Sequence, residues 1–154
     1  MSNSTFAYQT ESDVIEAAHQ MLASKARSGA IELSNPKDAS RFFRTQIACK
    51  EVEVFSVAFL DAQHRLITCD ILFQGTIDGS AVYPREVIKA SLKHNACALI
   101  VAHNHPSGES EPSHADRRIT DRLKKALELI DVRLIDHLVV THDHCTSFAE
   151  RGIL

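Results

Sequence analysis

Two histidines and an aspartate in one short stretch have the clearest capacity for chemistry in this sequence. His103 and His105 are separated by one residue at the end of an apolar run, and Asp116 follows a loop containing Pro, Gly and Ser. If residues 97–103 form a strand, its side chains alternate between two faces, so both imidazoles point to the same side. Two histidines and one carboxylate suit a catalytic zinc ion with a fourth position open for water.

A second explanation exists for Asp116. It lies three residues after Ser113, which is the spacing of a capping box at the start of a helix. Capping holds the polar side chains of both residues at the beginning of the helix, and a metal site needs polar atoms at the same place, so the two roles are compatible. We expect Ser113 and Asp116 to serve the helix start and the site together.

Periodicity and turn signals place the elements that must hold these residues. We expect helices over residues 13–25, 38–48, 84–94 and 113–130, and strands over 53–60, 65–73, 97–102, 133–141 and 146–149. Ser12 is the expected N-cap of the first helix. Strands and helices mixed in this order predict an α/β or α+β sandwich around a central sheet.

Length and composition narrow the classes of protein. The chain has 154 residues, of which 44% are hydrophobic and 24% charged, as is usual for one globular domain. There is no apolar run of about 18 residues that would predict a membrane span, and the N-terminus lacks a signal-peptide pattern, so a cytoplasmic protein is expected. The net charge of −3 gives no electrostatic footprint for sequence-independent nucleic-acid binding.

The four cysteines are far apart in the sequence and form no C-x-x-C pair. This spacing disfavours a zinc ribbon or a redox motif. In a cytoplasmic protein, we expect four reduced thiols, most of them buried. These cysteines are Cys49, Cys69, Cys97 and Cys145.

The text H-N-H-P-S-G-E-S-E-P-S-H-A-D, residues 103–116, resembles the signature of JAMM metalloproteases, H-x-H-P-x(6)-S-x(2)-D, at every defined position. Further blocks, G-T-I, Y-P-R-E-V, D-H-L-V-V and S-F-A-E-R-G, are similar to the RadC branch of that family. The resemblance extends from about Ser34 to the C-terminus. It divides the chain into an N-terminal helical extension, residues 1–33, and a RadC-like MPN/JAMM domain, residues 34–154.

The resemblance implies a fold and a metal. The fold is the MPN (JAB/JAMM) fold, a deaminase-like α/β sandwich with a central mixed sheet flanked by helices. One Zn²⁺ per chain would be held by His103, His105 and Asp116, with water as the fourth ligand. Zinc lowers the pKa of such a water and polarises an amide carbonyl.

The resemblance also implies catalytic residues. A glutamate on an upstream strand accepts the proton of the water and passes it to the leaving amine. Glu53 best matches that position, and Glu51, which has the same strand parity, is the alternative. Ser113 matches the serine that hydrogen-bonds the oxyanion of the tetrahedral intermediate.

Three functions compete at this point. The first is a zinc metallopeptidase or isopeptidase that cleaves an amide bond in a peptide or protein substrate. The second is a DNA-repair accessory or a nuclease of the HNH type, and the third is a non-catalytic MPN scaffold. Spacing and flanking residues favour the first, with Asn104 pointing outward between the two ligands.

Full-length RadC proteins usually carry a helix-hairpin-helix region that this chain lacks, so direct nucleic-acid binding is not expected. The sequence predicts no membrane partner and leaves the oligomeric state open.

Other polar residues carry weaker signals. A second metal site from His137, His142, His144 and Cys145 is not expected, because His137 and His142 face opposite ways by strand parity. His137 is instead expected to make a structural hydrogen bond or one that supports a metal ligand. Arg85, near the start of the helix over 84–94, either belongs to an ordinary helix start or contacts the substrate.

Overall fold

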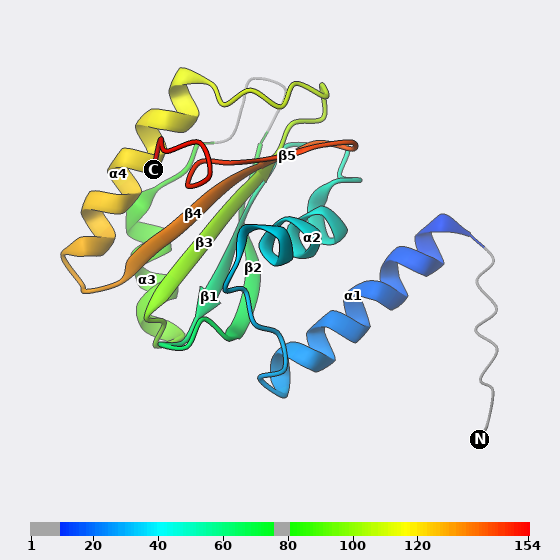
Figure 1. Ribbon diagram of the computed structural model, residues 1–154, viewed down its shortest axis with the longest axis horizontal. Helices are drawn as coiled ribbons and strands as arrows, with labels where there is room; N and C mark the ends of the chain where they lie inside the picture. The colour runs from blue at the N-terminus through cyan, green and yellow to red at the C-terminus, as the bar shows by residue number, and fades with distance from the viewer. Residues whose placement is uncertain (1–9, 76–80) are drawn as a thin grey trace.

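The structure of the chain is a computed structural model that describes residues 10–75 and 81–154. These residues form four helices and a five-stranded sheet (Figure 1). The elements are, in order, α1 (Glu11–Arg27), α2 (Pro36–Ile47), β1 (Val54–Leu60), β2 (Leu66–Gln74), α3 (Pro84–Lys93), β3 (Ala98–Asn104), α4 (His114–Glu128), β4 (Arg133–Val140) and β5 (Cys145–Ser147). The expected α/β class with a central sheet is confirmed.

The sheet is mixed and has the strand order β2-β1-β3-β4-β5. β3 and β4 are parallel and are joined through α4, whereas the other neighbouring pairs are antiparallel. Every residue of β1 and β3 is buried. Strands covered on both faces need apolar side chains on both sides, which explains their continuous hydrophobic runs.

Helices cover both faces of the sheet (Figure 1). On one face, α2 packs Phe43 and Ile47 against side chains of β1, β3 and β4. On the other face, α3 and α4 pack Val87, Leu123 and Leu127 against the alternate side chains of β1 and β3. Because side chains alternate along a strand, the face covered by α3 and α4 is also the one toward which His103 points.

The predicted elements are all present, with small shifts at their ends. The first helix begins at Glu11, and its cap is Thr10 rather than the predicted Ser12. The Thr10 hydroxyl accepts a hydrogen bond from the Asp13 backbone N–H at 3.2 Å, and the Asp13 carboxylate accepts one from the Thr10 N–H at 2.9 Å. Both residues are good caps, and this reciprocal pair decides between them.

The helix α1 lies beside α2 and the edge strand β2. The division of the chain at residues 33 and 34 remains a prediction. Among the described helices, none combines the length and the hydropathy needed to span a bilayer. All four cysteines are free thiols, but Cys49 and Cys97 are exposed, so the prediction that most are buried is wrong.

Candidate metal centre

The two histidines of the H-x-H pair converge at the end of β3. His103 is 2% exposed and belongs to the strand, while His105 directly follows it, held by a backbone hydrogen bond to Val140 of β4. Their side chains lie on the same side of the chain, as the strand parity predicted, and their Nε2 atoms are 2.9 Å apart. The sheet therefore brings two imidazole nitrogens to one point.

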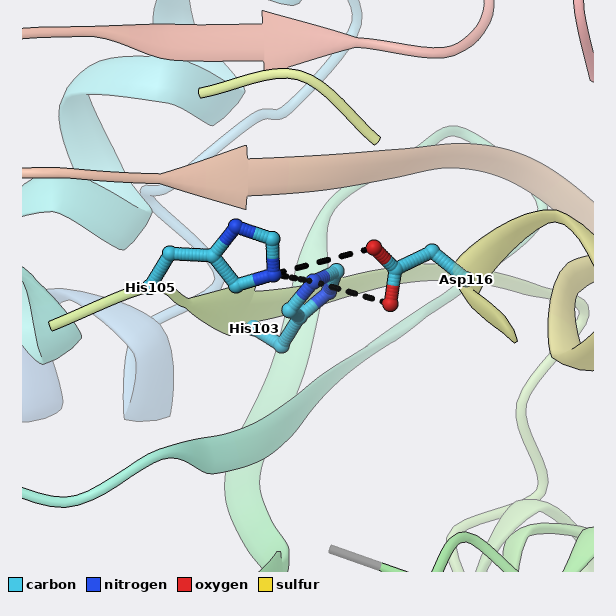
Figure 2. Close-up of side chains that lie close together, drawn as sticks. All are labelled: His103, His105 and Asp116. Carbon is cyan, nitrogen blue, oxygen red and sulfur yellow. Dashed lines mark hydrogen bonds and ion pairs between the residues drawn. The ribbon is translucent and has the colours of Figure 1, made fainter. Parts of the chain in front are cut away.

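Asp116 completes the group from the first turn of α4 (Figure 2). Its Oδ1 lies 3.2 Å from Nε2 of His103, and its Oδ2 lies 3.6 Å from Nε2 of His105. Ser113, the N-cap of α4, donates its backbone N–H to Oδ2 at 2.8 Å, and its hydroxyl accepts the Asp116 N–H at 3.1 Å. The expected capping box is present, and it aims the carboxylate at the histidines.

The carboxylate of Asp116 is ionised at neutral pH. Burial acts to raise its pKa, but its interaction with the imidazole of His103 and the hydrogen bonds from Ser113 outweigh burial. The pKa of Asp116 is therefore held well below its ordinary value. This negative charge beside two imidazoles would attract a cation.

A chain of hydrogen bonds fixes the tautomer of His103. The Thr120 hydroxyl donates to the backbone carbonyl of Asp116 at 2.6 Å, so its oxygen accepts from Nδ1 of His137, also at 2.6 Å. Burial and the nearby His103 lower the pKa of His137 well below its ordinary value, so this ring is neutral and its Nε2 accepts. Nδ1 of His103 donates to it at 2.8 Å, which leaves a lone pair on Nε2 of His103.

A backbone carbonyl fixes His105 in the same way. Nδ1 of His105 donates to the carbonyl of Glu109 at 2.7 Å, so the lone pair of a neutral His105 ring lies on Nε2. Two lone pairs that face each other beside a carboxylate repel unless a cation lies between them. The three ligand atoms all lie within 4.8 Å of one another. Nitrogen and carboxylate donors in this arrangement, with each imidazole held through its other nitrogen, fit a zinc ion.

The candidate bases differ in position. Glu53 lies two residues before Phe55, which pairs with His103 across β1 and β3, so Glu53 approaches the same end of the sheet. It lines the groove into which the histidines open, and its carboxylate is outside the three-residue ligand group. Glu51 is exposed and does not line this groove. The geometry thus favours Glu53, and its catalytic role stays a prediction.

Asn104, between the two histidines, does not face solvent. It points to the opposite side of the strand, as parity predicted, but it is 1% exposed, so the expectation of an outward-pointing residue is wrong. Its amide oxygen accepts the Val54 N–H at 2.7 Å, and its amide nitrogen donates to the carbonyls of Lys50 and Val52 at 3.1 and 3.0 Å. These bonds hold the segment that carries Glu53 to the strand that carries the ligands.

The weaker cluster does not assemble. His137 is fully buried in β4 and contacts His103, whereas His142 and His144 lie exposed beyond the end of that strand. Across residues 10–75 and 81–154, the one metal-like group found is His103, His105 and Asp116. The expected supporting hydrogen bond of His137 is present, whereas the expectation of no second metal stays a prediction.

The metal-like group opens into a groove of about 870 Å³. Residues of α4 line this groove, and so do Ala81, Val82 and Tyr83, just before α3. Ser113 also lines it, so its hydroxyl is available beside the ligands. Arg85 does not line the groove: its side chain is 82% exposed and lies 3.6 Å from Glu86, which favours an ordinary helix start.

Comparison with known sequences agrees with this geometry. The sequence model of the RadC-like JAB domain matches residues 33–153, which is most of the chain. This chain belongs to the RadC-like JAB domain family. The match covers the whole sheet and both sets of flanking helices, so the five-stranded architecture described above is that of a JAB/MPN domain.

The names of several relatives begin with "UPF0758 protein". One from Chromobacterium violaceum is 55% identical over 139 residues, which are 90% of this chain and 62% of that protein. One from Vibrio cholerae is 54% identical over 144 residues, 94% of this chain and 90% of that protein. One from Stenotrophomonas maltophilia is 50% identical over 140 residues, 60% of its length. The chain thus spans about three fifths of the relatives from Chromobacterium violaceum and Stenotrophomonas maltophilia and most of the one from Vibrio cholerae.

Sequence reasoning missed several residues of the RadC-like site. Thr120 lies one helical turn after Asp116, so the period of α4 was a usable signal for it. Arg118 and Arg122 lie on the same helix and line the groove. Val82 and Tyr83 also line the groove, and their place there depends on the packing of α3 against α4.

Proposed function

We propose that this RadC-like domain is a zinc-dependent hydrolase of the JAMM type that cleaves an amide bond in a peptide or protein. The observation that carries the proposal is the pair of Nε2 lone pairs of His103 and His105 facing the Asp116 carboxylate. Membership of the JAB family supports the same class of enzyme. The position of Glu53 in the same groove adds a group suited to proton transfer.

Each residue has a defined task in this proposal. The zinc ion would supply Lewis acidity, which activates a water and polarises the amide carbonyl. Glu53 accepts the proton of the attacking water and delivers it to the leaving amine. Ser113 already accepts the Asp116 N–H, so its own hydroxyl proton is free to donate to the developing oxyanion.

Metal analysis tests the first half of the proposal. Protein purified without added metal is expected to contain about one zinc per chain, and His103→Ala is expected to lose it. If the wild-type protein holds no zinc and His103→Ala behaves identically, the enzyme proposal is wrong.

Hydrolysis of a fluorescence-quenched peptide library tests the second half. Glu53→Gln should keep its zinc and lose about 10²- to 10⁴-fold in rate, the usual contribution of a general base. Glu51→Gln is the matched control and should behave as wild type. If Glu53→Gln retains hydrolysis and Glu51→Gln loses it, the base is Glu51.

A nucleic-acid-associated role is the second candidate, because one observation favours it. On the other face of the sheet, Lys37, Arg41 and Arg44 of α2 line a cavity of about 730 Å³ together with His142. No salt bridge of the described residues involves these three cations. DNA binding that weakens with salt and with the Arg41→Glu/Arg44→Glu variant, but survives removal of zinc, would support this role.

A further inference from the structure

One face of α4 forms a continuous wall of the groove beyond the metal-like group. Its contributors, Ala115, Arg118, Ile119 and Arg122, are spaced at the three- and four-residue steps that place side chains along one helix face. Asp116 lies at the beginning of the same helix. A substrate that reaches the ligands along this groove therefore passes two arginines.

These two arginines make no ion pair among the described residues. Both are exposed, and neither takes part in a salt bridge or a side-chain hydrogen bond within residues 10–75 and 81–154. Their neighbour Arg117 differs, because it lies 3.7 Å from Glu111. The acidic residues of the groove, Glu53 and Asp116, are both committed to the proposed catalytic end.

A solvated helix face explains isolated arginines on a convex surface, but these two line a concavity. Like charges one turn apart on a helix also repel each other. A bound carboxylate would remove that repulsion, because a guanidinium offers paired donors that match the two carboxylate oxygens. Peptide groups are neutral, so the charge must come from an acidic side chain or a chain terminus.

Helix geometry sets the distance of this charge from the reacting bond. With a rise of about 1.5 Å per residue, Arg122 lies about 9 Å along α4 from Asp116. An extended peptide advances about 3.3 Å per residue. Arg122 is therefore level with a substrate residue that is two or three positions from the amide bond at the metal.

We propose that Arg118 and Arg122 select peptides with a carboxylate two or three residues from the cleaved amide. The carboxylate belongs either to an aspartate or glutamate side chain or to the C-terminus of the peptide. This inference rests on the proposed function, since it takes the metal-like group as the reacting end of the groove.

A binding assay tests the carboxylate preference without depending on hydrolysis. The zinc-loaded full chain with Glu53→Gln is titrated, by fluorescence anisotropy, against labelled peptide libraries in which one position is fixed. At the fixed position, libraries with Asp are compared with libraries with Asn, and libraries with Glu with libraries with Gln; these comparisons report a side-chain carboxylate. Each library is also made with a free and with an amidated C-terminus, and this comparison reports a terminal carboxylate.

We expect one acidic version to bind at least roughly tenfold more tightly than its neutral partner, which is the effect of one charge-assisted hydrogen bond. Arg118→Ala/Arg122→Ala should abolish this ratio, and Arg118→Glu/Arg122→Glu should reverse it, so that the neutral version binds more tightly than the acidic one. Arg117→Ala removes the same charge one residue away and should leave the ratio unchanged.

Two results would overturn the inference: no carboxylate preference at any position, including no binding at all, or an equal loss of preference in Arg117→Ala. Failure of the proposed function gives a different pattern. In that case the wild-type protein hydrolyses none of the peptides, whether or not the acidic versions bind more tightly.

Discussion

Replacement of Thr120 by valine tests the hydrogen-bond chain behind the metal-like group. Valine keeps the shape of threonine but removes the hydroxyl, which donates to the Asp116 carbonyl and accepts from Nδ1 of His137, each at 2.6 Å. His137 is 0% exposed, so water cannot replace the lost acceptor. Nδ1 of His137 then has no partner in either tautomer. An unpaired buried polar atom costs about 1–3 kcal/mol, and we expect the free energy of unfolding to fall by that amount.

The same substitution should weaken zinc binding. Without the hydroxyl, His137 avoids an unpaired Nδ1–H by moving its proton to Nε2, where it donates to His103. Nδ1 of His103 must then accept, so its proton moves to the Nε2 that faces Asp116, and a ligand lone pair is lost. Loss of such a supporting partner typically reduces metal affinity about 10- to 100-fold.

Two measurements and one control decide the outcome. Zinc affinity is measured by competition with a chromogenic chelator at constant pH, and stability by urea unfolding of the metal-free protein. Thr120→Ser, which keeps the hydroxyl, should match the wild-type zinc affinity more closely than Thr120→Val. If Thr120→Val binds zinc and resists urea as the wild type does, the tautomer argument is wrong.

Three further predictions follow from other buried groups. Asn104→Ala removes the hydrogen bonds that hold the backbone around Glu53, so it should lower the free energy of unfolding by about 1–3 kcal/mol. It should also reduce the rate of hydrolysis more than it reduces zinc content. Equal losses of hydrolysis and of zinc would contradict this prediction. Burial raises the pKa of Asp136 despite its hydrogen bond from Ser147. The free energy of unfolding should therefore fall as pH rises from about 4 through the folded-state pKa of Asp136. Asp136→Asn should remove this pH dependence, as measured by urea unfolding at several pH values. Leu127→Ala should cost about 2–5 kcal/mol of stability because the side chain is fully buried, whereas Leu129→Ala, at an 86% exposed position, should change it by less than about 0.5 kcal/mol in the same assay.

Local patterns were sufficient for most of the fold. The continuous apolar runs of β1 and β3 and the period of α2 and α4 depend on contacts that repeat along one element, so sequence spacing reports them directly. Element ends were less secure. Thr10 and Ser12 are both capable N-caps, and only the reciprocal hydrogen bonds between Thr10 and Asp13 distinguish them.

The candidate site divides along the same line. His103 and His105 share a strand parity, and Ser113 and Asp116 share a helix start, so local spacing alone is enough to group these four residues. Asn104 was placed on the correct side of its strand but not in its correct environment. Parity gives the face of a strand, whereas burial depends on what packs against that face, here the segment before β1.

The sequence by itself determined which residues form the metal-like group, because these three residues are separated by short, locally ordered stretches, and one strand, one loop and one helix start fix their spacing. Only the tertiary structure decided what surrounds them. The antiparallel pairing of β1 with β3 brings Glu53 to the groove, the parallel pairing of β3 with β4 places His137 behind His103, and α4 aligns Arg118 and Arg122 along one wall. Strand order and helix docking depend on contacts between residues far apart in the chain, and no local periodicity encodes them.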